Sequence, residues 1–322
     1  MFKFQNIKNT IIYLFLSIGL SYTFIYKIPW HSIRVFQDFE RYKYNVRNLF
    51  FNGYEEESFG VFILFSEVLW ARILQVIPYY FYDIDSGLAF ISFCCLTIYI
   101  FFTITRVNFA IMYILLFNPI FIDLIISQVR IGLAFCLLLL AYSTRKTVIV
   151  PIFLIICATL IHTATPFLLL IFFVLMFLKY FSKNNPNFLK IAFILPLFIM
   201  ISFQFILLPI FDYFGDVERA GYMTNPIYSS LFFSFPWIFF SLMLTILPKG
   251  EFFDKNIDII SYAICMGSLF FFASVFKFYG SRFVAVSFPL FIISINSLSN
   301  QFKYLMFSIL FLYQIIYFAY WI

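Results

Sequence analysis

The sequence has little charge. Only 11% of its 322 residues are Asp, Glu, Lys or Arg, whereas 64% are hydrophobic and the mean hydropathy is +0.98. So few charges cannot cover the aqueous surface of a soluble domain of this length. The composition therefore excludes a soluble fold and predicts an all-α polytopic membrane protein.

Histidine is scarce, and cysteine is confined to apolar runs. The chain has two histidines, His31 and His162, and no H-x-x-E-H motif or Cys/His cluster. The five cysteines lie where cysteine usually behaves as a small buried hydrophobe: Cys94, Cys95, Cys136, Cys157 and Cys265. We therefore expect no disulfide framework, no metal site and no cofactor.

A basic patch is also missing. The net charge is +6, but the 21 Lys and Arg are scattered singly along the chain. Nucleic-acid-binding surfaces gather such residues on one face or in one run. The pattern argues against a nucleic-acid partner.

What the sequence does contain is a series of apolar runs of membrane length, about 20 residues each. The first, 7–28, follows Lys3 and Lys8 and lacks a small-x-small cleavage pattern, so we expect a retained helix. The later runs predict spans at 86–105, 107–126, 129–144, 147–161, 163–178, 190–209, 229–247, 257–275, 282–298 and 303–322. This gives about 11 transmembrane helices in a single membrane-embedded domain over 1–322.

The connections between these runs alternate in charge. One set carries most of the basic residues: Arg106, Arg145, Lys146, Lys179, Lys183, Lys190, Lys249, Lys255 and Lys303. The other carries only Arg130, Arg219, Lys277 and Arg282. Because short basic loops stay cytoplasmic, the second set is predicted to face outward. Arg130, His162, the loop 210–228 and Arg282 would then share the outer side.

The same alternation of inner and outer loops predicts that the segment 59–82 does not cross the membrane. Polar and aromatic residues interrupt it and crowd its end: Glu67, Arg72, Gln75, Tyr79, Tyr80, Tyr82, Asp83 and Asp85. We expect an interfacial or re-entrant helix here. The alternative is a conventional span with the N-terminus outside. In the preferred topology, loops 30–58 and 210–228 form an outer vestibule of acids, bases and tyrosines.

Three isolated cationic or basic residues stand out in this topology. Arg130 lies between two apolar runs, His162 ends the run 158–162, and Arg282 ends 278–282. An arginine that cannot discharge is costly at membrane depth, so Arg130 is the leading functional candidate. Each has a simpler alternative: Arg130 snorkels to the headgroups, His162 caps a helix or bonds a carbonyl, and Arg282 pairs with Asp216.

The layout resembles the bacterial polysaccharide polymerases of the EpsG and Wzy type. Four short features carry the resemblance along most of the chain. They are an acidic, Tyr-containing first outer loop (Asp38, Tyr42, Tyr44, Glu56, Glu57), an arginine opening a small-residue helix (residues 130–134), a histidine before small hydroxyl residues (residues 162–165), and a late arginine, Arg282. This chain departs from the family in having Ile131 after the helix-opening arginine and Gln128 before it.

The resemblance implies a GT-C-like membrane glycosyltransferase of O-antigen, capsule or lipopolysaccharide biosynthesis. It would polymerise undecaprenyl-diphosphate-linked oligosaccharide repeat units at the outer, periplasmic face of the bacterial inner membrane. A chain-length regulator and a flippase would be its partners. Such a reaction uses no nucleotide sugar, which agrees with the lack of a G-x-G-x-x-G or P-loop motif.

That reaction assigns roles to particular residues. Guanidinium groups match phosphate geometry, so Arg130 and Arg282 would bind the leaving diphosphate. The acceptor hydroxyl must lose a proton, for which Asp38, Glu57 and His162 are the candidates. The two carboxylates have a simpler alternative as solvated loop charges. Tyr42, Tyr44 and Tyr222 would stack against sugar rings.

Two other functions use similar chains. An O-antigen ligase would need the same arginines but usually has a larger outer loop. A lipid-linked oligosaccharide flippase should show internal repeats and charges spread through the depth of several helices. No repeat is visible in this sequence and the candidate charges concentrate at the predicted outer face, which favours the polymerase.

Overall fold

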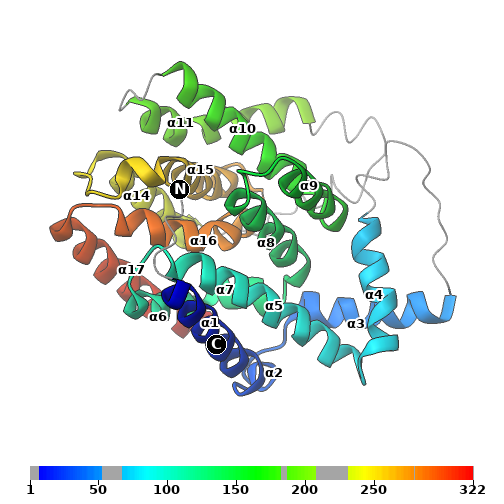
Figure 1. Cartoon of the computed structure of the whole chain (residues 1–322). Coiled ribbons are helices and arrows are strands. Elements are labelled where there is room, and N and C mark those ends of the chain that lie inside the picture. The colour runs from blue at the N-terminus through cyan, green and yellow to red at the C-terminus, as the bar shows by residue number, and fades with distance from the viewer. Residues whose placement is uncertain (1–6, 53–66, 183–186, 208–230, 279, 322) are drawn as a thin grey trace. The chain divides into compact units, whose positions relative to one another are not determined.

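The computed structural model describes residues 7–52, 67–182, 187–207, 231–278 and 280–321, and it is built from helices (Figure 1). Within these residues there is no strand, only an isolated bridge between Lys249 and Leu298. The predicted all-α fold class is therefore confirmed for this part of the chain.

The chain divides into two compact units. The first comprises Met1–Met112 and Phe121–Leu169, together with Ile322, and the second comprises Tyr113–Ile120 and Leu170–Trp321. The helices whose residues lie wholly or mainly in the first unit are α1 (Ile7–Tyr26), α2 (Trp30–Ile33), α3 (Gln37–Asn52), α4 (Val68–Tyr80), α5 (Ile84–Ile104), α7 (Pro119–Ile126), α8 (Val129–Ser143) and α9 (Ile149–Ile161). A single domain over 1–322 stays a prediction.

The other helices lie wholly or mainly in the second unit, apart from α10. They are α6 (Met112–Leu116), α11 (Asn187–Ser202), α14 (Leu231–Ile246), α15 (Phe253–Val275), α16 (Ser281–Asn296) and α17 (Asn300–Trp321). A 3-10 turn, η2 (Phe109–Ile111), precedes α6, and a π-helical turn, η3 (Phe203–Leu207), follows α11. Helix α10 (Thr165–Phe181) begins in the first unit and continues into the second.

The core of the first unit forms where α5, α7 and α8 meet. Tyr99 of α5 is fully buried, and its ring lies edge-on to Phe121 at 5.4 Å and stacks with Phe135 at 6.4 Å between centroids. Its hydroxyl donates to the carbonyl of Gly132 at 3.4 Å. A Cβ added at Gly132 would lie 3.3 Å from the carbonyl oxygen of Leu124. The small residue therefore lets the start of α8 lie close against α7.

In the second unit, α15 packs against α11, α14 and α16. Trp237 of α14 is fully buried, with ring contacts to Phe288 and Phe291 of α16 at 5.7 and 5.1 Å. Lys179, interpreted from the sequence only as a topology determinant, has a further role here. Its ammonium lies 2.6 Å from the carboxylate of Asp258 and joins α10 to α15.

Five helical segments in the described part of the chain are long and apolar enough to cross a membrane: Lys8–Ile33, Ile84–Ile104, Asn187–Phe205, Phe253–Val275 and Asn300–Trp321. A sixth arises if Phe109–Leu116 and Pro119–Ile126 together make one broken span. The run 107–126 was expected to be one helix. Proline lacks an N–H and disfavours the α conformation of the preceding residue, so Pro119 accounts for the break before α7.

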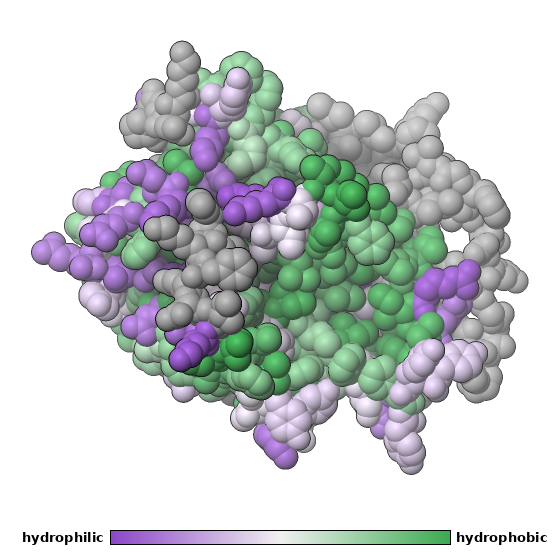
Figure 2. Space-filling model, viewed as in Figure 1, coloured by the Kyte–Doolittle hydropathy of each residue, from purple (hydrophilic) through white to green (hydrophobic). Residues whose placement is uncertain are grey.

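Five further apolar helices have 13 to 17 residues: α8, α9, α10, α14 and α16. Apolar side chains also cover much of the face drawn in Figure 2, as expected of a surface that contacts lipid. These features indicate a membrane protein. The total of 11 spans, the GT-C-like arrangement and the identity of the membrane stay predictions.

The described part of the segment 59–82 forms α4, an amphipathic helix of 13 residues. Trp70, Leu74 and Ile77 are buried along one side, whereas Tyr79 and Tyr80 are exposed. A helix of this length rises only about 20 Å, which is short for a span. The geometry of α4 is compatible with the predicted interfacial or re-entrant helix, and residues 59–66 lie outside the described part.

Candidate functional site

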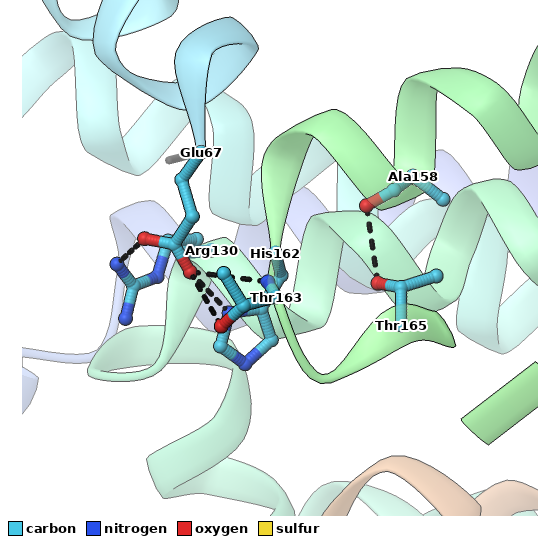
Figure 3. Close-up of polar contacts among 6 residues, drawn as sticks. All are labelled: Glu67, Arg130, Ala158, His162, Thr163 and Thr165. Atoms are coloured by element: carbon cyan, nitrogen blue, oxygen red, sulfur yellow. Dashed lines mark hydrogen bonds and ion pairs between the residues drawn. The ribbon is translucent and has the colours of Figure 1, made fainter. Parts of the chain in front are cut away.

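A partly buried carboxylate, that of Glu67, joins three segments of the first unit. Its Oε2 accepts a hydrogen bond from Nη1 of Arg130 in an ion pair. Its Oε1 lies 2.8 Å from Nδ1 of His162, 3.2 Å from the backbone nitrogen of Thr163 and 3.3 Å from the Thr163 hydroxyl (Figure 3). The residue before α4, the first turn of α8 and the α9–α10 connection therefore meet at one side chain.

The α9–α10 connection has a local structure that presents these donors. Helix α9 ends at Ile161, and His162 is extended, with φ −146° and ψ 126°. The His162 N–H donates to the carbonyl of Ala158 at 3.1 Å, and the Thr165 hydroxyl donates to the same carbonyl at 3.0 Å. The last turn of α9 is thus capped by Thr165, and the N–H of Thr163 remains available for Glu67.

Glu67 itself has an uncommon backbone conformation. Its φ of 54° and ψ of 37° place it in the left-handed region. For a residue with a side chain this conformation costs about 1–2 kcal/mol. Its carbonyl accepts the first helical hydrogen bond of α4, from the N–H of Ala71 at 3.1 Å. The polar contacts of the carboxylate offset the backbone cost and fix where α4 begins.

The cluster is largely shielded from solvent. The side chains of His162, Glu67 and Arg130 are 6%, 16% and 27% exposed. Burial by itself raises the pKa of Glu67, but the hydrogen bond from His162, the charge of Arg130 and the N–H of Thr163 together bring the pKa below its ordinary value. Glu67 is therefore ionised at neutral pH.

The ionised carboxylate determines which nitrogen of His162 carries hydrogen. A carboxylate only accepts hydrogen bonds, so Nδ1 of His162 is the donor and Nε2 of the neutral ring carries the lone pair. Figure 3 shows Nε2 on the side of the ring away from Glu67. The arrangement can hold an anion at the guanidinium and exchange a proton at the imidazole.

Arg130 and His162, two residues singled out in the sequence, are thus brought together by a third. The ion pair of Arg130 with Glu67 goes beyond the snorkelling alternative. The His162 side chain bonds the Glu67 carboxylate at 2.8 Å, a contact that neither of its simpler alternatives included. Neither finding tests the roles assigned to the two residues in catalysis and diphosphate binding, which stay predictions.

The other predicted site residues lie elsewhere or outside the described part. Asp38 is half-buried in the first turn of α3. Tyr42 is buried against Trp70, with ring centroids 5.2 Å apart, so its ring helps to pack α3 on α4. Tyr44 is 66% exposed. Arg282 lies in the first turn of α16, in the second unit. Outside the described residues are Glu57, Tyr222 and Asp216.

Sequence reasoning missed Glu67 and Thr163 as site residues. Glu67 was noted only as an interruption of the apolar run 59–82. A signal was nevertheless present, because an arginine between apolar runs requires an acid or an anionic ligand, and Glu67 is an acid inside such a run. In the described part of the chain, no group of three or more His, Cys, Asp and Glu is placed to hold a metal ion.

Comparisons with protein-family models, curated proteins and solved structures found no match to this chain. The resemblance to the EpsG- and Wzy-type polymerases therefore stays a prediction that rests on the residues described above.

Proposed function

We propose that this chain is a membrane glycosyltransferase that polymerises lipid-diphosphate-linked oligosaccharide repeat units. The reaction would take place at the outer face of the bacterial inner membrane and would yield long-chain surface polysaccharide. The observation that carries the proposal is the convergence of Arg130 and His162 on Glu67. A permanent cation and an oriented base, shielded from water at helix ends, are what transfer from a lipid diphosphate requires.

Arg130 would stabilise the leaving group. When the anomeric carbon–oxygen bond breaks, its electron pair stays on the diphosphate, whose charge rises. A guanidinium can bind two phosphate oxygens side by side and remains charged at any physiological pH. Arg282 is proposed as a second phosphate ligand on the strength of the sequence resemblance.

His162 would accept the proton of the acceptor sugar. The hydroxyl oxygen attacks the anomeric carbon as the bond to the diphosphate breaks, and the hydroxyl proton moves to Nε2 of His162. Glu67 fixes the tautomer and stabilises the imidazolium that forms. The proton then leaves to water before the next cycle. The hydrogen bond from His162 to Glu67 favours His162 over Asp38 and Glu57 as the base.

One observation favours a flippase as the second candidate. The break between Phe109–Leu116 and Pro119–Ile126 resembles the discontinuous helices that hold substrate in many transporters. In that case Glu67 and His162 would relay protons beside the fixed positive charge of Arg130, coupled to lipid movement. An O-antigen ligase would share the chemistry proposed above and differ in its acceptor.

The surface polysaccharide of cells that lack this chain distinguishes the three functions. The proposal predicts single-repeat caps on the lipid core, because unpolymerised units can still be transferred. Free long polymer would instead indicate a ligase, and the loss of both caps and polymer a flippase. Normal long chains on the surface would contradict the proposal.

A further inference from the structure

The two oxygens of Glu67 are held unequally. Oε1 accepts from His162 and from both the N–H and the hydroxyl of Thr163, all on one short connection. Among the described residues, Oε2 has its ion pair with Arg130 on a different helix. If Arg130 were given another anion, the carboxylate would keep its attachment to the α9–α10 connection. The Arg130 contact is therefore the exchangeable one.

One hydrogen-bond donor of the Arg130 guanidinium also lacks an acceptor. Its Nε is buried and has no hydrogen-bond partner among the described residues, since Glu67 engages Nη1. A buried donor of a charged group without a partner is costly. A phosphate group has oxygens enough to accept from two guanidinium nitrogens at once, which a single carboxylate oxygen does not do. The orphaned Nε thus points to an oxyanion ligand that the substrate-free chain does not supply.

The side chains of Arg130 and His162 differ in their exposure to solvent. The Arg130 side chain is 27% exposed, whereas the His162 side chain is 6% exposed. Of these two partners of Glu67, the Arg130 side chain is therefore the more accessible to an incoming anion.

We propose that Glu67 occupies the oxyanion position of Arg130 in the substrate-free chain and yields it to the phosphate groups of the lipid-linked donor. This inference rests on the function proposed above and adds a regulatory role for Glu67. Once the phosphate neutralises Arg130, the charge of Glu67 acts on His162 alone and makes the imidazole a stronger base. Binding of the lipid-linked donor would thereby make His162 the stronger base that the reaction needs. Without the donor, His162 would be a weaker base and would activate water less.

The test is a binding measurement on the full chain in lipid nanodiscs, with undecaprenyl diphosphate as the probe. Replacing Glu67 by Gln removes the competing charge, so Glu67→Gln should bind the probe about tenfold more tightly than the wild type. The matched control is Glu40→Gln, which removes a carboxylate from the Lys43 ion pair in the same unit. It should bind like the wild type. Equal or weaker binding by Glu67→Gln would overturn the exchange.

A second probe identifies the source of the phosphate. Phosphatidylglycerol should gain less affinity than undecaprenyl diphosphate from Glu67→Gln, because its single phosphodiester carries less negative charge than a diphosphate. An equal gain for this phospholipid would assign the position to bulk headgroups and overturn the link to the donor. In Arg130→Gln, neither probe should respond to the additional Glu67→Gln change. A response there would show that Arg130 is not the shared partner.

A measurement on the wild type covers the case in which Glu67→Gln does not fold. Hydrophobic carbodiimides label protonated carboxyl groups, and loss of a nearby cation favours protonation, so undecaprenyl diphosphate should raise labelling of Glu67 about threefold. Unchanged or reduced labelling would overturn the proposal. Neither measurement involves an acceptor or turnover. A chain that does not polymerise could still show the exchange, and a polymerase could lack it.

Discussion

Nδ1 of His162 lies 2.8 Å from Oε1 of Glu67, across 95 residues of chain. This hydrogen bond ties the residue before α4 to the end of α9. Because Glu67 also pairs with Arg130 at the start of α8, a change at any one of the three residues alters the setting of the other two. The predictions below use this coupling.

Replacing His162 by Gln should abolish chain extension. Glutamine can keep a hydrogen bond to Glu67 but cannot accept the acceptor's proton, and we expect a loss of roughly 10²-fold or more. The length distribution of surface polysaccharide measures this, with protein abundance as the check on folding. His31→Gln is the matched control, since His31 packs on the ring of Phe39, with ring centroids 4.4 Å apart. Long polymer in the His162→Gln strain would remove this residue from catalysis.

For Arg130, lysine should substitute poorly. An ammonium retains the charge but cannot form the planar two-pronged contact with phosphate, so Arg130→Lys and Arg130→Ala should both leave single-repeat caps. Arg130→Ala should in addition destabilise the fold by about 1–3 kcal/mol, because Glu67 loses a partner while remaining shielded. Arg72→Lys, which changes an exposed arginine of α4 bonded to Gln75, serves as the control. Full activity of Arg130→Lys would contradict a bidentate role.

Glu67→Gln should separate binding from turnover. Without the carboxylate charge the imidazolium is less stable, and the maximal rate should fall about 10–100-fold. The same change should lower the donor concentration needed for half-maximal rate, because Arg130 no longer has a competing anion. Initial rates at varied donor concentration measure both quantities. A parallel rise in both would be inconsistent with Glu67 as a positioning residue.

Lys249 predicts a pH dependence of stability. Burial lowers the pKa of Lys249 from 10.5 to about 8. Between these values the unfolded chain binds more protons than the folded chain, so the free energy of unfolding should rise as pH increases from about 8 to about 10.5. Unfolding of Lys249→Met should show a weaker rise over this window, whereas exposed Lys255→Met should follow the wild type. Identical curves for wild type and Lys249→Met would refute the assignment.

The topology predicts that Thr163 and Ser281 are accessible from outside and Lys146 from the cytoplasm. The five native cysteines would be replaced, and single cysteines introduced at these positions would be labelled with a membrane-impermeant reagent. Labelling of Thr163→Cys and Ser281→Cys from opposite sides would rule out a shared outer site for His162 and Arg282.

Helix positions could be predicted from the sequence because they depend on local features, namely the length of each apolar run and the charged residues that separate the runs. The run 147–161 corresponds to α9 (Ile149–Ile161), and 282–298 to α16 (Ser281–Asn296). The break before Pro119 was also readable, since proline disrupts the helix locally. It was overlooked because the hydropathy of the run continues across it.

The site was only partly predictable, for a physical reason. Arg130 and His162 stand out because isolated polar groups in apolar surroundings need a partner. Their common partner, Glu67, is set by packing between segments distant in sequence, which hydropathy and charge spacing do not encode. The left-handed backbone at Glu67 is likewise a product of tertiary contacts, since no glycine or asparagine marks the position.

Helices α8 and α9 have 15 and 13 residues, so they rise only about 23 and 20 Å. A typical hydrocarbon core is about 30 Å thick. If both helices span the membrane, as the sequence predicts, the membrane around this hairpin must thin or headgroups must dip toward Arg130 and His162. Either response costs a fraction of a kcal/mol for each ångström of mismatch. The acyl-chain length of the surrounding lipids would therefore affect the cluster of Glu67, Arg130 and His162 indirectly. A thicker bilayer would oppose the approach of a lipid headgroup to Arg130, and a thinner bilayer would favour it.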